Sequence, residues 1–249
     1  MTVRAKVVVA SIAVVLAGWQ LAGQLGLVDV RYTSVPTAIA SAGIELARSG
    51  ELWSNASLTL LEFLTGFVFA VAVGVPLGML MGWRLRLRQT LEPALAALYV
   101  TPSLALLPLV VLALGIGPAS KIAMVFIEAL ITIVVNSMAG IRETDRKLVR
   151  AARSFCASEV AVFRKVLLPS ALPTVMAGLR LGAGRGVIAV IVAELYGGTR
   201  GIGLQISSYG QSFVIAPLLF LTLLVGIFGY AVSTALRATE RRASSWKEA

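Results

Sequence analysis

Four ionisable side chains lie inside apolar stretches of this 249-residue chain: Glu62, Glu128, Arg185 and Glu194. A charge within a membrane is costly, so such residues usually face a solute pathway, an ion site or an opposite charge. Arg185 and Glu194 share one stretch, but about 13 Å of helix separates them, which is too far for direct contact. We interpret the four as interfacial or structural charges, with a pathway role as the alternative. We expect water to reach Glu62 and Glu128 near the ends of their spans.

Enzymatic chemistry of the common kinds is excluded by composition. The chain has no histidine and one cysteine, Cys156, so it contains neither an internal disulfide nor a histidine-based zinc site or catalytic triad. The nucleotide-binding pattern G-x-x-x-x-G-K-[ST] is absent, and the glycine-rich stretch 182–186 lacks the Lys-Ser/Thr that would follow. We therefore expect no catalytic residue, no cofactor and no metal site, and a separate polypeptide if ATP drives this protein.

The composition indicates a membrane protein. Hydrophobic residues make up 58% of the chain and charged residues 14%, against about 45–50% and about 25% in soluble domains. A hydrocarbon core of about 30 Å needs about 20 apolar residues per helix, and backbone polar groups in lipid must be paired within helices. We predict an all-α polytopic membrane protein, one domain over residues 1–249 with its core at about 54–236. Six spans are expected, at about Val7–Leu25, Ser57–Trp83, Leu91–Leu114, Ile122–Ala139, Ala177–Leu195 and Phe213–Leu236.

Lysine and arginine are distributed unevenly between these spans. Two precede the first span, three lie between the second and third, eight lie in segment 140–180 and four lie in the tail. Because positive residues favour the cytoplasmic side, we expect both termini and segment 140–180 in the cytoplasm. We assign the net charge of +10 to this orientation and not to nucleic-acid binding. The first apolar stretch exceeds the 7–15 residues of a cleaved signal peptide, so we retain it as a span.

Glycines and prolines predict how the helices pack and bend. Pro102 and Pro108 interrupt the third span, and proline kinks a helix; broken helices can line a pathway, although a simple bend fits equally. Pro36 favours the start of a short helix at the outer surface. Small residues four apart allow close helix contact, within the chain or in a dimer, and two such series occur: Gly74, Gly78 and Gly82, and Gly178, Gly182 and Gly186.

Segment 140–180 is long and basic, and its sequence pattern favours helices. These properties are typical of a docking surface. It contains Arg150-Ala151-Ala152, three residues, Cys156, nine residues, Val166, one residue and Leu168-Pro169. This pattern resembles the EAA loop of binding-protein-dependent ABC importer permeases, which reads Glu-Ala-Ala, three residues, Gly, nine residues, Ile, one residue, Leu-Pro. The spacing is identical, whereas Arg150, Cys156 and Val166 replace Glu, Gly and Ile.

The resemblance extends from about Ser34 to about Tyr209 and is closest to the nitrate, sulfonate, taurine and bicarbonate permeases. The order of its motifs is more specific than any one of them. They are Leu106-Leu-Pro-Leu-Val, Gly115-Ile-Gly-Pro-Ala-Ser-Lys-Ile122, Asn136 with Ala139-Gly140-Ile-Arg142, and Gly178-Leu-Arg-Leu-Gly182 with Ala193-Glu194.

The resemblance implies a type I ABC importer permease fold with a cytoplasmic coupling helix, within the coupling loop at about 140–178. It implies a pathway formed by two permease copies, expected to be a homodimer in the lipid of a bacterial inner membrane. Two cytoplasmic ABC ATPase subunits would drive transport, and an extracytoplasmic solute-binding protein would deliver a small anion such as nitrate, a sulfonate, taurine or bicarbonate. The residues expected to couple to the ATPase are Arg150, Ala151, Ala152, Phe155, Cys156, Leu168 and Pro169.

Several of these positions carry specific expectations. Phe155 and Phe163 are expected to anchor in apolar pockets of the ATPase, and Pro169 with Pro173 to end the coupling helix. Cys156 is expected to be a small buried thiol. Arg150 reverses the family's charge at a position interpreted as a helix N-terminus, where an acid is favoured, so a co-adapted contact with the ATPase is our hypothesis.

Two other classes of protein remain as alternatives. An ion-coupled secondary carrier would use Glu62, Glu128 or Glu194 as its proton or ion site and would need no ATPase, but it leaves the long basic segment unexplained. A membrane-embedded enzyme is disfavoured by the lack of histidine and of a clustered catalytic set.

Overall fold

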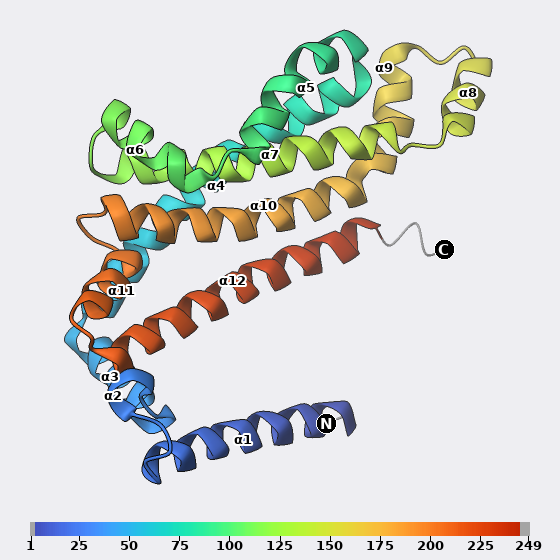
Figure 1. The fold of residues 1–249 in the computed structure, drawn as a ribbon. Helices are drawn as coiled ribbons and strands as arrows, with labels where there is room; N and C mark the ends of the chain where they lie inside the picture. The colour runs from blue at the N-terminus through green and yellow to red at the C-terminus, as the bar shows by residue number, and fades with distance from the viewer. Residues whose placement is uncertain (1–2, 245–249) are drawn as a thin grey trace.

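The computed structural model describes residues 3–244, and within that range the chain is helical with no strand (Figure 1). This confirms the predicted fold class. The helices are α1 (Val3–Gln24), α2 (Val30–Thr33), α3 (Pro36–Ser49), α4 (Glu51–Trp83), α5 (Leu85–Val100), α6 (Ser103–Leu114), α7 (Pro118–Arg142), α8 (Arg146–Ser154), α9 (Glu159–Val162), a π-helical turn (Phe163–Leu167), α10 (Leu168–Gly197), α11 (Ile202–Gln211) and α12 (Ile215–Ser244).

Four helical runs among the described residues are long and apolar enough to cross a membrane. They are Glu51–Trp83, Pro118–Arg142, Glu159–Gly197 and Ile215–Glu240, and they confirm the second, fourth, fifth and sixth predicted spans. The first predicted span falls on α1, whose described apolar part, Ala10–Gln24, is shorter than a span. The predicted count of six spans is therefore not confirmed.

The third predicted span is not one continuous helix. Helix α5 and the part of α6 from Ala105 to Leu114 meet at an angle of 108°. The break lies at Thr101 and Pro102, both of which have extended ψ values, 125° and 124°. Proline lacks the amide hydrogen of a helix and disfavours helical geometry in the residue before it, so the Thr-Pro pair separates the two halves.

Helix α7 lies between α4 and α10 and packs closely against both. The two glycine series line these contacts. A Cβ atom at Gly78 of α4 would lie 2.5 Å from the Val134 carbonyl oxygen of α7, and one at Gly178 of α10 would lie 2.5 Å from Cβ of Asn136. The glycines therefore pack helices within the chain.

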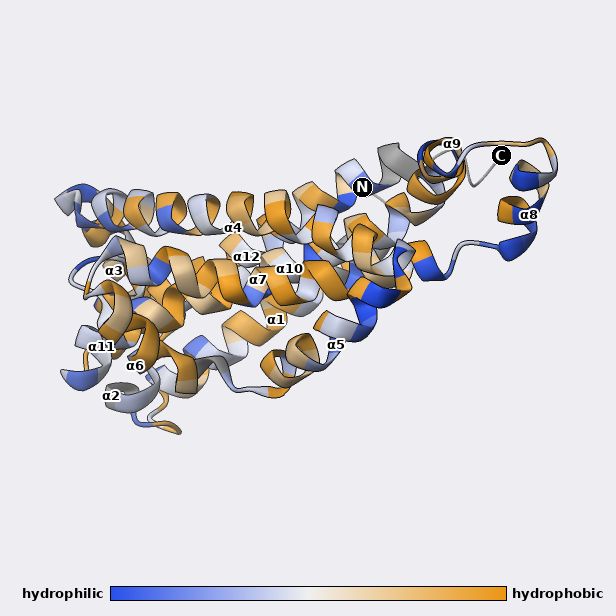
Figure 2. Cartoon of the chain, turned by 90° about the horizontal axis from the view of Figure 1, so that it is seen from above, coloured by the Kyte–Doolittle hydropathy of each residue, from blue (hydrophilic) through white to orange (hydrophobic). Residues whose placement is uncertain are grey.

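The two ends of the bundle differ in character. Helices α8 and α9 project at one end, and α3 and α11 lie at the other (Figure 1). Hydrophobic residues run along the long helices, and hydrophilic residues concentrate at the ends, most densely around α8 (Figure 2). Pro36 is the first residue of α3, which confirms the predicted short helix. Helix α1 begins, and α12 ends, on the side of α8 and α9.

We predict that Gly78→Ala destabilises the protein. The new methyl group would meet the Val134 backbone and Cβ of Ser137, neither of which can rotate away, and overpacking of this kind costs about 1–3 kcal/mol. The melting temperature in detergent should fall. Gly184→Ala, in α10, is the matched control because its Cβ would meet nothing within 4 Å. Equal melting temperatures for the two variants would contradict the close α4–α7 contact.

Candidate functional site

Helix α8 is the part of the 140–180 segment that stands furthest from the bundle. The Asp145 carboxylate accepts a hydrogen bond from the Lys147 amide at 2.8 Å and caps the helix. Arg150 lies in the second turn and is exposed. The interpretation of Arg150 as a helix-terminal charge is therefore wrong, because the chain places an acid, Asp145, at that terminus.

The two alanines of the segment have different environments. Ala152 packs with Val149 against a cluster of buried residues that includes Ile141 and Val162, whereas Ala151 is exposed. Helix α8 thus turns Ala152 to the bundle and leaves Ala151 and the Arg150 side chain exposed.

Phe155 and Cys156 form the turn after α8. The Phe155 side chain is 87% exposed, which is unusual for a phenylalanine and leaves it available to a partner. Cys156 has φ of 55°, in the region that glycine adopts most easily, and this explains why the family pattern has glycine there. Cys156 is exposed, so the expectation of a buried thiol is wrong.

Phe163 and Pro169 do not take the roles expected from the sequence. The Phe163 ring stacks on Trp83 of α4 at 4.8 Å between centroids, so it anchors the segment to its own bundle. Pro169 does not end a helix, because the run Glu159–Gly197 is continuous. The π-helical turn Phe163–Leu167 precedes Leu168 and Pro169, and the wider turn accommodates the missing proline donor. Pro173 likewise lies inside α10.

A basic groove of about 830 Å³ separates α8 from the ends of α4 and α7. Its walls carry five guanidinium groups, and Glu143 is the one acidic side chain that lines it. An acidic or mixed-charge partner suits such a groove better than a basic one. The arginines are Arg88, Arg142, Arg146, Arg150 and Arg153.

Two of the membrane charges are fully buried at the opposite end. Glu62 of α4 and Lys121 of α7 form an ion pair with 2.6 Å between Oε1 and Nζ, and their side chains are 0% and 2% exposed. Lys121 Nζ also donates to the Arg200 carbonyl oxygen at 3.2 Å. Neither Glu62 oxygen accepts a well-directed hydrogen bond from a described residue, so the pairing is by charge. The expectation that water reaches Glu62 is wrong.

Glu194 joins three helices next to that ion pair. Its carboxylate accepts hydrogen bonds of 2.7 Å from the Thr59 hydroxyl of α4 and from the Gly203 amide of α11. Gly201, with φ of 124°, lies so close that a Cβ there would overlap the Glu194 carboxylate. We call Thr59, Glu62, Lys121, Glu194 and Gly203 the buried polar cluster.

Glu128 and Arg185 are brought together near the middle of α7 and α10. Their closest oxygen and nitrogen atoms are 3.8 Å apart, and Arg185 is 48% exposed against 12% for Glu128. The guanidinium lies 5.5 Å from the centre of the Tyr99 ring. Arg185 and Glu194 were predicted to be too far apart to pair, and this is confirmed. Arg185 pairs with Glu128, whereas Glu194 bonds to Thr59 and Gly203.

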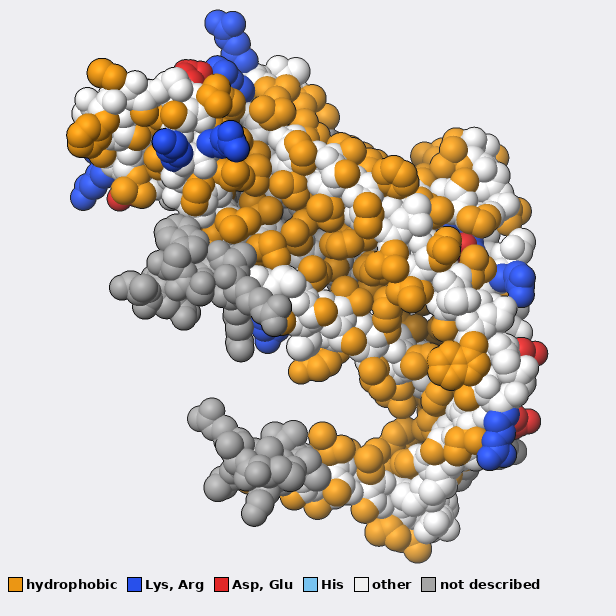
Figure 3. Space-filling view, turned by 180° about the vertical axis from the view of Figure 1, so that it is seen from behind, with side chains coloured by type: hydrophobic (Ala, Val, Ile, Leu, Met, Phe, Trp, Pro, Cys, Tyr) orange, Lys and Arg blue, Asp and Glu red, His pale blue; other side chains and the backbone are white. Residues whose placement is uncertain are grey.

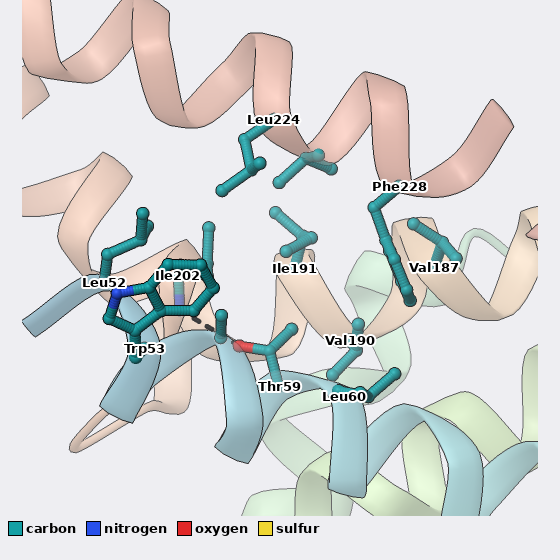
Figure 4. A pocket seen from close by; sticks show the side chains of 12 residues that line it. Leu52, Trp53, Thr59, Leu60, Val187, Val190, Ile191, Ile202, Leu224 and Phe228 are labelled. Carbon is teal, nitrogen blue, oxygen red and sulfur yellow. Dashed lines mark hydrogen bonds between the residues drawn. The ribbon is translucent and has the colours of Figure 1, made fainter. Parts of the chain in front are cut away.

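An apolar cavity of about 210 Å³ lies between α4, α10, α11 and α12. Trp53, Ile191, Leu224 and Phe228 converge on it (Figure 4), and the hydroxyl of Thr59 in its wall accepts the Ile202 amide hydrogen. No charged side chain lines this cavity, so it suits apolar contact with a helix or lipid better than binding of a polar solute.

Sequence reasoning missed Lys121 and Thr59 as functional candidates. Lys121 entered the sequence analysis only as part of a family motif, although it starts an apolar run two turns before Glu128. A lysine at that position, with an unpaired Glu62 in another span, was the available signal. Thr59 has no comparable signal, because threonine is common in helices of this kind.

The chain matches the family described as "Binding-protein-dependent transport system inner membrane component" over residues 74–245. It is 32% identical to a probable ABC transporter permease protein of Brucella abortus (strain 2308), with 96% of this chain and 94% of that protein aligned. It is 30% identical to the taurine transport system permease protein TauC of Escherichia coli (strain K12), covering 96% and 88%. It is 31% identical to SsuC of Bacillus subtilis (strain 168), named for aliphatic sulfonates transport, covering 94% and 85%.

Solved structures agree on the fold. An inward-facing MetNI methionine ABC transporter chain superimposes with a TM-score of 0.70 at 20% identity, covering 79% of this chain and 98% of that one. A chain of an amino acid ABC transporter gives 0.66 at 18% identity, covering 80% and 96%. Because the family match spans most of the chain and the relatives align over nearly all of it, this chain belongs to the binding-protein-dependent ABC importer permeases.

Proposed function

We propose that this permease imports a small sulfonate, such as taurine or an alkanesulfonate. The observation that carries the proposal is alignment over at least 94% of the chain with relatives named for taurine and aliphatic sulfonates transport. Nitrate and bicarbonate, which the sequence left open, are not the solutes for which these relatives are named. An ion-coupled carrier is not supported, because Glu62 and Glu194 are occupied by Lys121, Thr59 and Gly203.

The work of transport comes from two ATPase subunits that bind the α8–α9 end. The exposed Phe155, Arg150 and Ala151 form the contact, and the basic groove behind α8 receives acidic groups of the ATPase. This chain lacks a P-loop sequence and supplies no ATP site of its own. The α8–α9 end and both chain termini lie in the cytoplasm, in agreement with the distribution of lysine and arginine.

A second copy of this chain completes the pathway, and a solute-binding protein docks at the α3–α11 end. Large hydrophobic side chains are exposed on α5 and α6, among them Val100, Leu109 and Leu112 at 79%, 62% and 83%. The opposite side of the bundle, where α4 lies, is also broadly hydrophobic, with charges at its margins (Figure 3). Lipid and the second copy of this chain together cover these hydrophobic surfaces. Two copies of this chain are sufficient to form the pathway.

The buried polar cluster holds α11 against the rest of the bundle. It ties α4, α7, α10 and α11 together through one ion pair and two hydrogen bonds to Glu194. Opening toward the outside would separate α11 from these helices, so the cluster stabilises the state described by this structure.

The transport proposal predicts ATP-dependent uptake of sulfonates. The permease, reconstituted with its cognate ATPase and solute-binding protein, should accumulate radiolabelled taurine or ethanesulfonate, and nitrate should not compete. Omission of either partner is the control and should abolish uptake. Accumulation of solute by the permease alone would mean that it is a secondary carrier.

Phe155→Ala should weaken the ATPase contact. Truncation of an exposed aromatic anchor typically costs an interface more than about 1 kcal/mol, or at least about fivefold in affinity. Binding-protein-stimulated ATP hydrolysis and co-purification of the ATPase should both fall. Phe213→Ala is the matched control for co-purification of the ATPase, because Phe213 is 71% exposed but lies between α11 and α12, at the opposite end of the bundle.

Arg150 is tested in the same assay. Arg150→Glu should reduce stimulated ATP hydrolysis with the cognate ATPase. The substitution would replace a positive charge on α8 that faces acidic groups of the ATPase with a negative one. Unchanged coupling would exclude the co-adapted contact.

Lys121→Met should destabilise the permease more than most single substitutions. It leaves the Glu62 carboxylate buried without its partner, which costs about 3–5 kcal/mol. The double variant with Glu62→Gln should recover much of the loss in melting temperature. Lys147→Met, at an exposed site on α8, should have little effect, and an equally small effect of Lys121→Met would contradict the ion pair.

A further inference from the structure

A polar cavity of about 240 Å³ lies at the break between α5 and α6. Since a water molecule occupies about 30 Å³ of liquid, the cavity has room for a small solute. Helix α7 contributes Glu128 and Thr132 to its wall, α10 contributes Arg185, and the break contributes Thr101 and Pro102. Its position, near the middle of α7 and α10, is where transporters with discontinuous helices hold their solutes.

Arg185 is the exposed charge of this cavity. Its side chain is 48% exposed and its nearest nitrogen is 3.8 Å from Glu128, which is longer than a hydrogen bond. The Tyr99 ring lies against the guanidinium at 5.5 Å. Arg185 is therefore held in place by the charge of Glu128 and by the face of the Tyr99 ring. Its guanidinium N–H groups remain available in the cavity to donate hydrogen bonds to oxygen atoms of a solute.

Two other ion pairs show what a structural pair looks like in this protein. Arg180, five residues earlier in α10, donates a 2.7 Å hydrogen bond to Glu240. Glu62 and Lys121 lie 2.6 Å apart and are fully buried. The Glu128–Arg185 pair is longer than both, and Arg185 is more exposed than Arg180 or Lys121. Packing alone therefore gives no reason for a half-exposed arginine at this depth, where a charge is costly.

We propose that Arg185 binds the anionic head group of the solute as it crosses the membrane. Glu128 is the resident counter-ion, which orients the guanidinium when the cavity holds no solute. A planar guanidinium can donate two parallel hydrogen bonds to a sulfonate or carboxylate, and it does so most strongly where little water competes. The identification of the solute as a sulfonate rests on the proposed function, whereas the preference of the cavity for anions does not.

The charge preference of the cavity can be measured by cysteine modification. Cys156 is the single native cysteine, and Cys156→Gly removes it at a position with φ of 55°. Thr101→Cys then places a thiol in the cavity wall. In membranes containing the assembled complex, its reaction rate with a negatively charged sulfonatoethyl methanethiosulfonate is compared with that of the positively charged trimethylammonium analogue.

With Arg185 present, the negative reagent should be favoured, and Arg185→Gln should lower the ratio of the two rates by at least about threefold. Glu128→Gln should raise the ratio. Arg180→Gln is the matched control, because it removes the same charge from the same helix, away from the cavity, and should leave the ratio unchanged. An unchanged ratio in Arg185→Gln, or an equal fall in Arg180→Gln, would overturn the proposal.

A second measurement separates solute binding from coupling. In the reconstituted complex, Arg185→Gln should lower taurine or ethanesulfonate uptake by about tenfold, the effect of one lost charge-assisted hydrogen bond. Arg185→Lys should restore part of it, and binding-protein-stimulated ATP hydrolysis should persist. A parallel loss of ATP hydrolysis would place Arg185 in coupling and refute a solute contact. The modification rates need neither ATP nor uptake, so the cavity is tested even if the transport proposal fails.

Discussion

The close contact of α7 with α4 and α10 is the constraint on which the rest of the structure depends. Glycines on α4 and α10 leave no side chain between the backbones, so carbonyl oxygens of α7, such as those of Ile122 and Val134, lie against the neighbouring helix. In lipid there is no hydrophobic force between helices, and association depends on such close packing. The three helices therefore form one body that connects the α8 end to the buried polar cluster.

This packing also decides which charges are fixed and which remain open. Glu62, Lys121 and Glu194 lie between the packed helices, where each is buried and has a partner. Glu128 and Arg185 lie on the side of the same body that faces the α5–α6 break. No side chain of α5 is buried, so that side is not sealed by the chain itself. The same three helices thus carry a structural charge cluster and an accessible one.

Much of this arrangement was readable from the sequence, and the rest was not, for identifiable reasons. Apolar length located α4, α7, α10 and α12, and glycine spacing located their contacts. The pairing of Glu62 with Lys121 depends on which helices pack together. Local sequence patterns do not predict that packing. Pro102 and Pro169 look alike in sequence, but the first follows an extended residue and breaks a helix, while the second follows a π-helical turn and does not. The stacking of Phe163 on Trp83 likewise depends on tertiary contact.

The continuity of α10 bears on the proposed coupling between α8 and the solute. The helix runs without a break from the π-helical turn to Gly197, so Arg185 lies about 26 Å and Glu194 about 39 Å along the axis from Leu168, at about 1.5 Å per residue. Packed helices deform little, and interfaces change between discrete arrangements. A displacement of α8 and α9, anchored by Phe163 to α4, is thus carried by the whole three-helix body. In the proposed coupling, relative movement would appear where this body meets its neighbours, among them α5 and α6, whose break forms part of the wall of the cavity that contains Arg185.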